Sequence, residues 1–196
     1  RMRFRRDWPS GGIGCGDLLL RSNVVALVGG GATPMWPPTK VVIWDDLRNT
    51  TIAELDFPSA VKSVFIRKEL LITVVETDVH VNRFDNLDRL TSLATCRNPL
   101  GLCSVNSNDA LSTILCCPGP ALGSLTIEWV DISAGGSEDE IPDTEAAAAS
   151  ASSAAAVSAL TDPTVAHSRG APITIKSHQN ALLCLCTSQD GTMVAT

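Results

Sequence analysis

The 196-residue chain contains no tyrosine, and aromatic residues make up only 4% of it. Its three histidines are scattered, and its seven cysteines include no Cys-x-x-Cys pair. No apolar run approaches the ~18 residues that a membrane-spanning helix needs. These absences argue against a zinc site and against a transmembrane segment.

Sequence motifs of common enzyme classes are also missing. The glycines at 29–31 suggest a phosphate-binding loop, but no Gly-Lys-Ser or Gly-Lys-Thr follows them. No Gly-x-Ser-x-Gly nucleophile elbow occurs. Asp45 and Asp46 are adjacent carboxylates suited to acid–base work, but they end a predicted strand, where turns commonly hold acids. We therefore expect no enzyme activity, no cofactor and no bound metal.

The charge balance and the hydrophobic content narrow the class further. The net charge is −6, so the chain has no overall basic field and we expect no nucleic-acid partner. The hydrophobic content of 44% is enough for a packed core. Cysteines 116, 117, 184 and 186 lie in apolar, strand-like runs, and we expect them to be buried free thiols.

Short strands with regular turns dominate the pattern. Residues 24–28 and 40–45 are two apolar runs joined by a Gly/Pro-rich turn, and residues 52–57 alternate with one charged face. Turn residues recur roughly every ten positions, which is typical of an all-β meander. Further strands are predicted at 61–66, 70–75, 79–84, 90–95, 100–105, 111–117, 124–131 and 182–187.

One stretch interrupts this pattern. Residues 134–171 combine an acidic cluster with an Ala/Ser tract, and they have too little apolar bulk to fold alone. We expect a disordered, solvent-exposed loop, either a tolerated insertion or a Ser-rich segment regulated by phosphorylation. The predicted organisation is a basic lead-in at 1–17, blades at 18–133, this loop at 134–171 and a truncated further blade at 172–196.

Several segments resemble a known family. Residues 26–31 read A-L-V-G-G-G, residues 37–41 read P-P-T-K-V, and residues 43–46 read I-W-D-D. Residues 95–103 read T-C-R-N-P-L-G-L-C, with Leu100 in place of the usual lysine. These segments resemble the PROPPIN (WIPI) family of seven-bladed WD-repeat β-propellers, which bind phosphoinositides in autophagy. At roughly 40–45 residues a blade, about four blades are present, so we expect a piece of a longer protein.

The resemblance implies a phosphatidylinositol 3-phosphate effector that recruits autophagy machinery to membranes, with phosphatidylinositol 3,5-bisphosphate as a second ligand. It implies a cytoplasmic protein, peripheral on phagophore, endosomal or vacuolar membranes, with lipid-transfer or conjugation proteins as partners. The family's lipid motif, Phe-Arg-Arg-Gly, lies several blades later than Phe4-Arg5-Arg6. Asp7 also stands where that motif has glycine, so Arg5 and Arg6 are expected to be solvated linker charges.

The resemblance also suggests site residues, each with a plainer structural alternative. His178 and Thr196 fall near the rim of the first lipid pocket, although a histidine at this turn commonly makes a hydrogen bond within its own blade. Arg67 and Lys68, with Lys40, fall near a groove between blades that binds partners, although such cations are commonly just solvated. The main arginine pair would lie after Thr196.

Two points stay open on the sequence alone: the position of His80, and whether the protein binds lipid or only other proteins. His80 is expected to face solvent or a neighbouring blade. The alternative function is a WD-repeat scaffold that binds proteins and no lipid. A Phe-Arg-Arg-Gly motif in the longer protein would favour lipid binding over this alternative.

Overall fold

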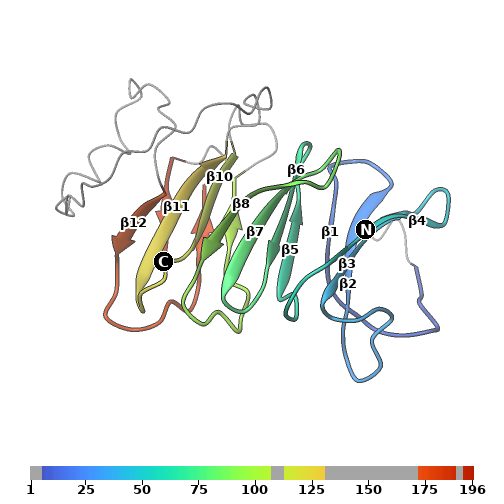
Figure 1. Cartoon of the computed structure of the whole chain (residues 1–196), viewed down its shortest axis with the longest axis horizontal. Coiled ribbons are helices and arrows are strands. Elements are labelled where there is room, and N and C mark those ends of the chain that lie inside the picture. The colour runs from blue at the N-terminus through green and yellow to red at the C-terminus, as the bar shows by residue number, and fades with distance from the viewer. Residues whose placement is uncertain (1–5, 107–112, 131–171, 189–191) are drawn as a thin grey trace, which may run out of the picture. The chain divides into compact units, whose positions relative to one another are not determined.

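The computed structural model describes residues 6–106, 113–130, 172–188 and 192–196. These residues contain fourteen strands and no helix (Figure 1). The chain divides into two compact units, an N-terminal unit of Arg1–Cys103 and a C-terminal unit of Ser104–Thr196. The predicted all-β class is therefore confirmed. The predicted loop at 134–171 lies outside the described residues.

The N-terminal unit holds two four-stranded antiparallel sheets, each with its strands in chain order. The first sheet consists of β1 (Ile13–Leu18), β2 (Val24–Gly29), β3 (Lys40–Asp45) and β4 (Thr50–Asp56). The second consists of β5 (Ser63–Ile66), β6 (Leu70–Val74), β7 (Asp78–Arg83) and β8 (Arg89–Ala94). Four strands joined by successive hairpins are the unit from which propeller blades are built.

The C-terminal unit holds a third four-stranded sheet in the order β12-β11-β10-β9 and a two-stranded sheet. The third sheet consists of β9 (Ser104–Val105), β10 (Thr113–Pro118), β11 (Ser124–Val130) and β12 (Ile173–Lys176). Strands β13 (Cys186–Thr187) and β14 (Val194–Ala195) form the two-stranded sheet.

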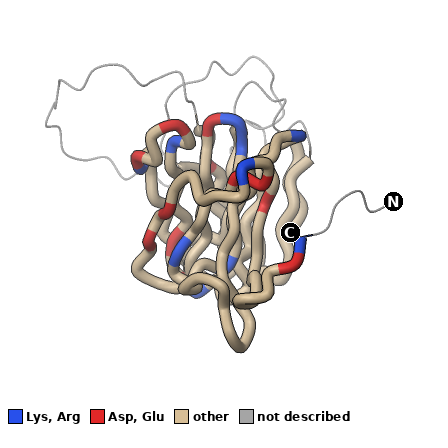
Figure 2. The backbone as a smooth tube through the Cα atoms, turned by 90° about the vertical axis from the view of Figure 1, so that its right-hand side faces the viewer, with Lys and Arg blue, Asp and Glu red and all other residues tan. Residues whose placement is uncertain are grey.

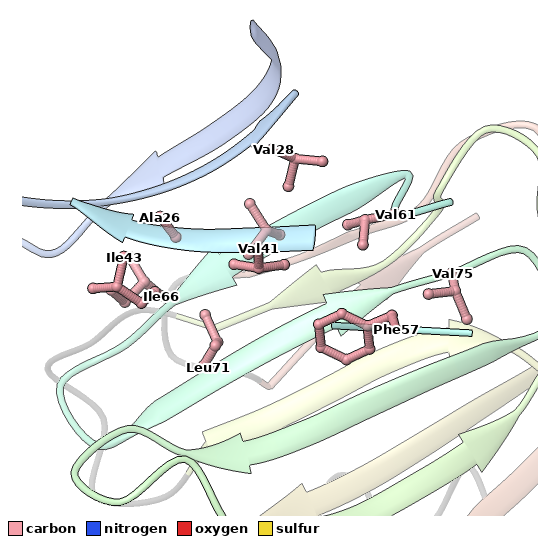
Figure 3. Packing of buried hydrophobic residues seen from close by; sticks show 10 residues of the cluster. Ala26, Val28, Val41, Ile43, Phe57, Val61, Ile66, Leu71 and Val75 are labelled. Atoms are coloured by element: carbon pink, nitrogen blue, oxygen red, sulfur yellow. The ribbon is translucent and has the colours of Figure 1, made fainter. Parts of the chain in front are cut away.

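The core of the N-terminal unit lies between its two sheets. Side chains from β2 and β3 meet side chains from β5 and β6, and the connection from β4 to β5 adds Phe57 and Val61 (Figure 3). Ile66 and Leu71 are fully buried there. Burying a side chain of this size contributes about 1.5–3 kcal/mol. This shared core holds the two sheets against each other.

The first strand lies inside the segment predicted as a lead-in. Strand β1 begins at Ile13, so the predicted boundary at residue 18 is corrected. Glycine permits a close pairing in this strand, in which Gly16 lies opposite Leu27. A Cβ atom on Gly16 would lie 2.7 Å from the carbonyl oxygen of Ala26. Only glycine fits this approach.

The boundary at residue 172 is also corrected. Strand β12 pairs with β11, with Lys176 opposite Ser124, and so completes the third sheet instead of opening a further blade. A long insertion separates two neighbouring strands of one sheet here. Chain length between paired strands has little entropic cost, because the cost of loop closure grows only with the logarithm of loop length.

The strand predicted at 100–105 is mostly a loop, and only Ser104–Val105 is extended into β9. Asn98 holds this loop: its Nδ2 donates to the carbonyl oxygen of Leu102 (2.9 Å), and its Oδ1 accepts from the Leu102 amide (2.8 Å). Gly101 has φ +65°, a left-handed conformation that suits glycine. The hydrogen bonds of Asn98 and the left-handed conformation of Gly101 therefore favour a loop where the apolar run predicted a strand.

None of the seven cysteines forms a disulfide. Cys116 and Cys117 are buried as predicted, and burial raises the pKa of Cys116 to about 12. Cys184 and Cys186 are exposed, so the prediction of burial was wrong for these two. Residues 182–185, predicted as strand, make no ladder, and Leu183 is exposed as well. Leu182 of the same run is buried, and Cys186 belongs to β13.

Candidate functional site

Arg67 is held by an ion pair within the N-terminal unit. Its Nη1 donates to Asp17 Oδ2 (3.2 Å) and to the carbonyl oxygen of Ile66 (2.9 Å). The same carboxylate oxygen of Asp17 accepts from the Ile66 amide (3.0 Å). The Arg67 side chain is 17% exposed. Asp17, on β1 of the first sheet, therefore fixes the turn between β5 and β6 of the second sheet.

The other two predicted partner-binding cations differ in setting. Lys68 follows Arg67 in the turn and is exposed. The Lys40 Nζ donates to Glu54 Oε2 (2.6 Å) and lies 3.8 Å from Asp56 Oδ2. The hydrogen bond with Glu54 raises the pKa of Lys40. Lys40 is therefore held by two carboxylates of the neighbouring strand β4.

The structure does not bring Lys40 and Arg67 together. Lys40 begins β3, next to Val41, which lies opposite Val28. Asp17, the partner of Arg67, lies opposite Ala26, closer to the other end of the sheet. The two positions are separated by about 10 Å along the strands. Along the backbone, positions of Lys and Arg are interspersed with positions of Asp and Glu (Figure 2).

The two residues predicted at a lipid rim do meet. His178 Nε2 and Thr196 Oγ1 share a hydrogen bond of 2.7 Å in the C-terminal unit. Both residues are exposed. Imidazole and hydroxyl groups can each donate to a phosphate oxygen, and a protonated imidazole donates more strongly. We call these two residues the His178–Thr196 pair.

Gly123 positions His178 from the adjacent turn. Its carbonyl oxygen accepts from the amides of Ser177 and His178, both at 3.0 Å, and from Ser177 Oγ at 3.2 Å. Gly123 has φ +74°, and a Cβ atom there would lie 2.8 Å from the carbonyl oxygen of Asn180. These hydrogen bonds hold the turn before β11 against the segment after β12.

Sequence reasoning missed a cluster of tryptophans on the first sheet. Trp8 contacts Trp36 and Trp44 edge to face, with ring centroids 5.4 and 5.0 Å apart. The guanidinium of Arg6 lies 5.7 Å from the Trp8 ring and pairs with Asp46. Arg6 was predicted to be a solvated linker charge, and this is corrected. Three tryptophans among so few aromatic residues were the available signal.

Asp45 has a structural role at the turn after β3. Its Oδ1 accepts from the amides of Leu47 (2.9 Å) and Arg48 (3.1 Å) and from the side chain of Asn23. These hydrogen bonds, with that of the Arg48 amide first, lower the pKa of Asp45. The carboxylate that was weighed for acid–base chemistry is thus an acceptor for its own turn.

Metal ligands and membrane spans are both lacking in the part of the chain that the structure describes. It contains no group of three or more His, Cys, Asp and Glu side chains arranged to hold a metal ion. Within the same ranges, no helix has the length and apolar character needed to cross a bilayer.

No family model matches the chain. Curated relatives do. Over 134 residues it is 34% identical to SVP1-like protein 2 of Pichia angusta, covering 67% of this chain and 36% of the relative. Over 104 residues it is 38% identical to Autophagy-related protein 18e of Arabidopsis thaliana, covering 53% of this chain and 28% of the relative. The chain belongs to the PROPPIN family.

Solved structures agree on the PROPPIN fold. Hsv2 of Kluyveromyces lactis superposes with a TM-score of 0.62 at 18% identity, over 97% of this chain and 46% of that one. At this identity the likeness shows the fold alone, and it confirms the predicted partial β-propeller. This PROPPIN chain spans less than half the length of the two curated relatives and of Hsv2.

Proposed function

We propose that this PROPPIN chain is part of a phosphatidylinositol 3-phosphate effector that acts as a scaffold in autophagosome formation. In this role the propeller binds a membrane from the cytoplasmic side and recruits lipid-transfer or conjugation proteins to it. Phagophore, endosomal and vacuolar membranes are the proposed sites of action, and phosphatidylinositol 3,5-bisphosphate is a proposed second ligand. The function requires no catalysis.

The observation that carries this proposal is the His178–Thr196 pair. His178 Nε2 and Thr196 Oγ1 lie 2.7 Å apart on exposed side chains, although the two residues are 18 positions apart in the chain. Together they offer an imidazole and a hydroxyl to one phosphate group. Such a contact is too weak to bind a lipid alone, so the proposal assigns the main charge to the arginine pair of the longer protein. Two weak lipid-binding sites on one surface of the longer protein would gain affinity by binding the same membrane at once.

The partner-binding role is proposed for the turn between β5 and β6. Asp17 holds Arg67, so Lys68 is the cation that a partner would meet first. An exposed cation on a rigid turn attracts an acidic segment and mainly raises its rate of association. Lys40 lies elsewhere on the first sheet and would belong to a separate contact.

The second candidate is a WD-repeat scaffold that binds proteins and no lipid. The observation that favours it is the anchored turn at Arg67, which would present Lys68 whether or not lipid is bound. The two candidates differ in one property, which is lipid-dependent recruitment to membranes.

Liposome flotation separates the candidates. The 196-residue chain and the longer protein to which it is proposed to belong are mixed with liposomes that contain or lack phosphatidylinositol 3-phosphate. We expect only the longer protein to float, and only with the lipid. If neither floats, the protein-binding scaffold is favoured. If this chain alone binds at micromolar lipid with 3-phosphate specificity, the assignment of the main charge to the arginine pair is wrong.

A further inference from the structure

A row of buried polar side chains lies between the two sheets of the N-terminal unit. Thr73 on β6 is opposite His80 on β7, and Asn82 on β7 is opposite Leu71 on β6. Their exposures are 0% for Thr73, 5% for His80 and 4% for Asn82. Of the two positions expected from the sequence for His80, facing solvent or facing a neighbouring blade, the first is wrong, because the structure buries His80 and stacks its ring on Phe57 in the core between the two sheets.

This row faces the first sheet. Side chains on a strand alternate between faces, so Thr73 shares a face with Leu71, and residues directly opposite share a face too. Leu71 packs in the core between the sheets. The ring of His80 also stacks on Phe57, which belongs to the same core, with centroids 5.4 Å apart and an interplanar angle of 17°.

Each member of the row keeps one polar atom without a hydrogen-bond partner in the structure: Thr73 Oγ1, His80 Nε2 and Asn82 Oδ1. His80 Nδ1 shares a hydrogen bond of 2.9 Å with Ser92 Oγ on β8. A neutral imidazole is accommodated by the ring stack and this single bond. A second proton would place a full charge on a buried ring whose Nε2 has no acceptor.

We propose that His80 is an acid-sensitive joint between the two sheets: the buried site holds the neutral ring, and protonation of the ring loosens the packing of the second sheet against Phe57. The inference does not depend on the proposed lipid function.

The groups around His80 set the sign of the effect. Burial is the main cause that lowers its pKa, the charge of Arg89 on β8 lowers it further, and Asp78 on β7 raises it. Strand β6 and the connection after β4 present Thr73 and Phe57, which do not titrate. The folded state therefore binds the proton less readily than the unfolded state. Stability is full above about pH 6.5 and falls as the pH drops toward the lowered folded pKa.

The test measures unfolding by urea between pH 7.5 and 5.5 for the 196-residue chain. While His80 stays neutral in the folded state, the folding equilibrium constant should fall about tenfold per pH unit below 6.5. His80→Phe should flatten this dependence, because the ring stack is kept and the titrating group is lost. His178→Gln is the matched control, since it removes an exposed histidine of the other unit, and the pH dependence assigned to His80 should persist in it.

The test compares how the free energy of unfolding changes with pH, so it remains valid even if His80→Phe is less stable than the unaltered chain at every pH. A second measurement covers the case in which that variant does not fold. Histidine ring resonances followed by NMR in the unaltered chain give the His80 pKa directly. A His80 pKa at or above 6.5, or a pH slope that persists in His80→Phe, overturns the proposal.

Discussion

Two polar contacts of the molecule differ in a way that bears on function. Asp17 and Arg67 form an ion pair that is mostly covered, joins two sheets and also binds a backbone amide. His178 and Thr196 form a contact between an imidazole and a hydroxyl that is exposed to solvent. The first contact serves the fold, and the second leaves its atoms accessible to a ligand.

Charge alone would favour Arg67 over the His178–Thr196 pair as a site for a phosphate or an acidic group, and the exposure of the two contacts favours the opposite choice. Arginine is the usual partner for phosphate and acidic groups, yet Arg67 already has a carboxylate at 3.2 Å. A ligand at Arg67 would have to displace Asp17 and leave the Ile66 amide without its acceptor. A ligand at the His178–Thr196 pair would break one exposed hydrogen bond. Accessibility, more than charge, separates the two contacts.

The largest effect should come from breaking the covered contact. Asp17→Ala removes the acceptor of both the Ile66 amide and Arg67, and we expect a loss of about 1–3 kcal/mol in the free energy of unfolding. Urea denaturation measures it. Asp56→Ala is the control, since the side chain of Asp56 is 72% exposed, and it should change stability by less than about 0.5 kcal/mol. Equal effects of the two substitutions would contradict the structural role of Asp17.

The next largest effect should come from the turn beneath the exposed contact. Gly123→Ala adds a Cβ near the carbonyl oxygens of His178 and Asn180 at φ +74°. The left-handed conformation alone costs about 1–2 kcal/mol, and the contacts add to that cost. Gly31→Ala is a matched control, with φ +85° and nothing within 4 Å of the added Cβ. Urea denaturation should show a larger loss for Gly123→Ala, and similar losses would mean that the contacts at the turn are unimportant.

The exposed contact itself should matter for lipid and hardly for folding. We expect His178→Gln and Thr196→Val to change the free energy of unfolding by less than about 0.5 kcal/mol. In the longer protein, each should weaken binding to phosphatidylinositol 3-phosphate liposomes about three- to tenfold, the value of one hydrogen bond. Flotation against a lipid series measures this. Unchanged lipid binding would place the phosphate elsewhere.

The smallest effect on stability should come from Lys68→Ala. Lys68 is exposed, so we expect a change below about 0.5 kcal/mol, against a clear loss for its neighbour in Arg67→Ala. Thermal unfolding of the two variants side by side makes the comparison. If Lys68→Ala destabilises the chain as much as Arg67→Ala, the two cations share one structural role.

The sequence predicted the strands well where alternation and turn residues agree. Residues 40–45 were predicted as a strand, and β3 has the same bounds. The predictions failed where a local feature opposed the pattern. Glycines near β1 allow a close pairing that resembles a turn in sequence, and Asn98 with Gly101 closes a loop within an apolar run.

The candidate sites were harder to predict than the strands. The contact between Asp17 and Arg67 joins residues 50 positions apart, and no local pattern reports such a distance. The His178–Thr196 pair was reached only through the family resemblance, which placed both residues near one rim. The burial of His80 depends on the packing of its own sheet against the first sheet, because the alternation of β7 alone predicts a half-exposed strand.

The central claim, that the exposed His178–Thr196 pair faces the lipid phosphate, is tested most directly by NMR. Soluble short-chain phosphatidylinositol 3-phosphate is titrated into the longer protein while the ring resonances of His178 and His80 are followed. The account predicts a saturable shift at His178 and none at the buried His80. If His178 does not move while the lipid binds, the pair is only a structural contact within its unit and the claim is wrong.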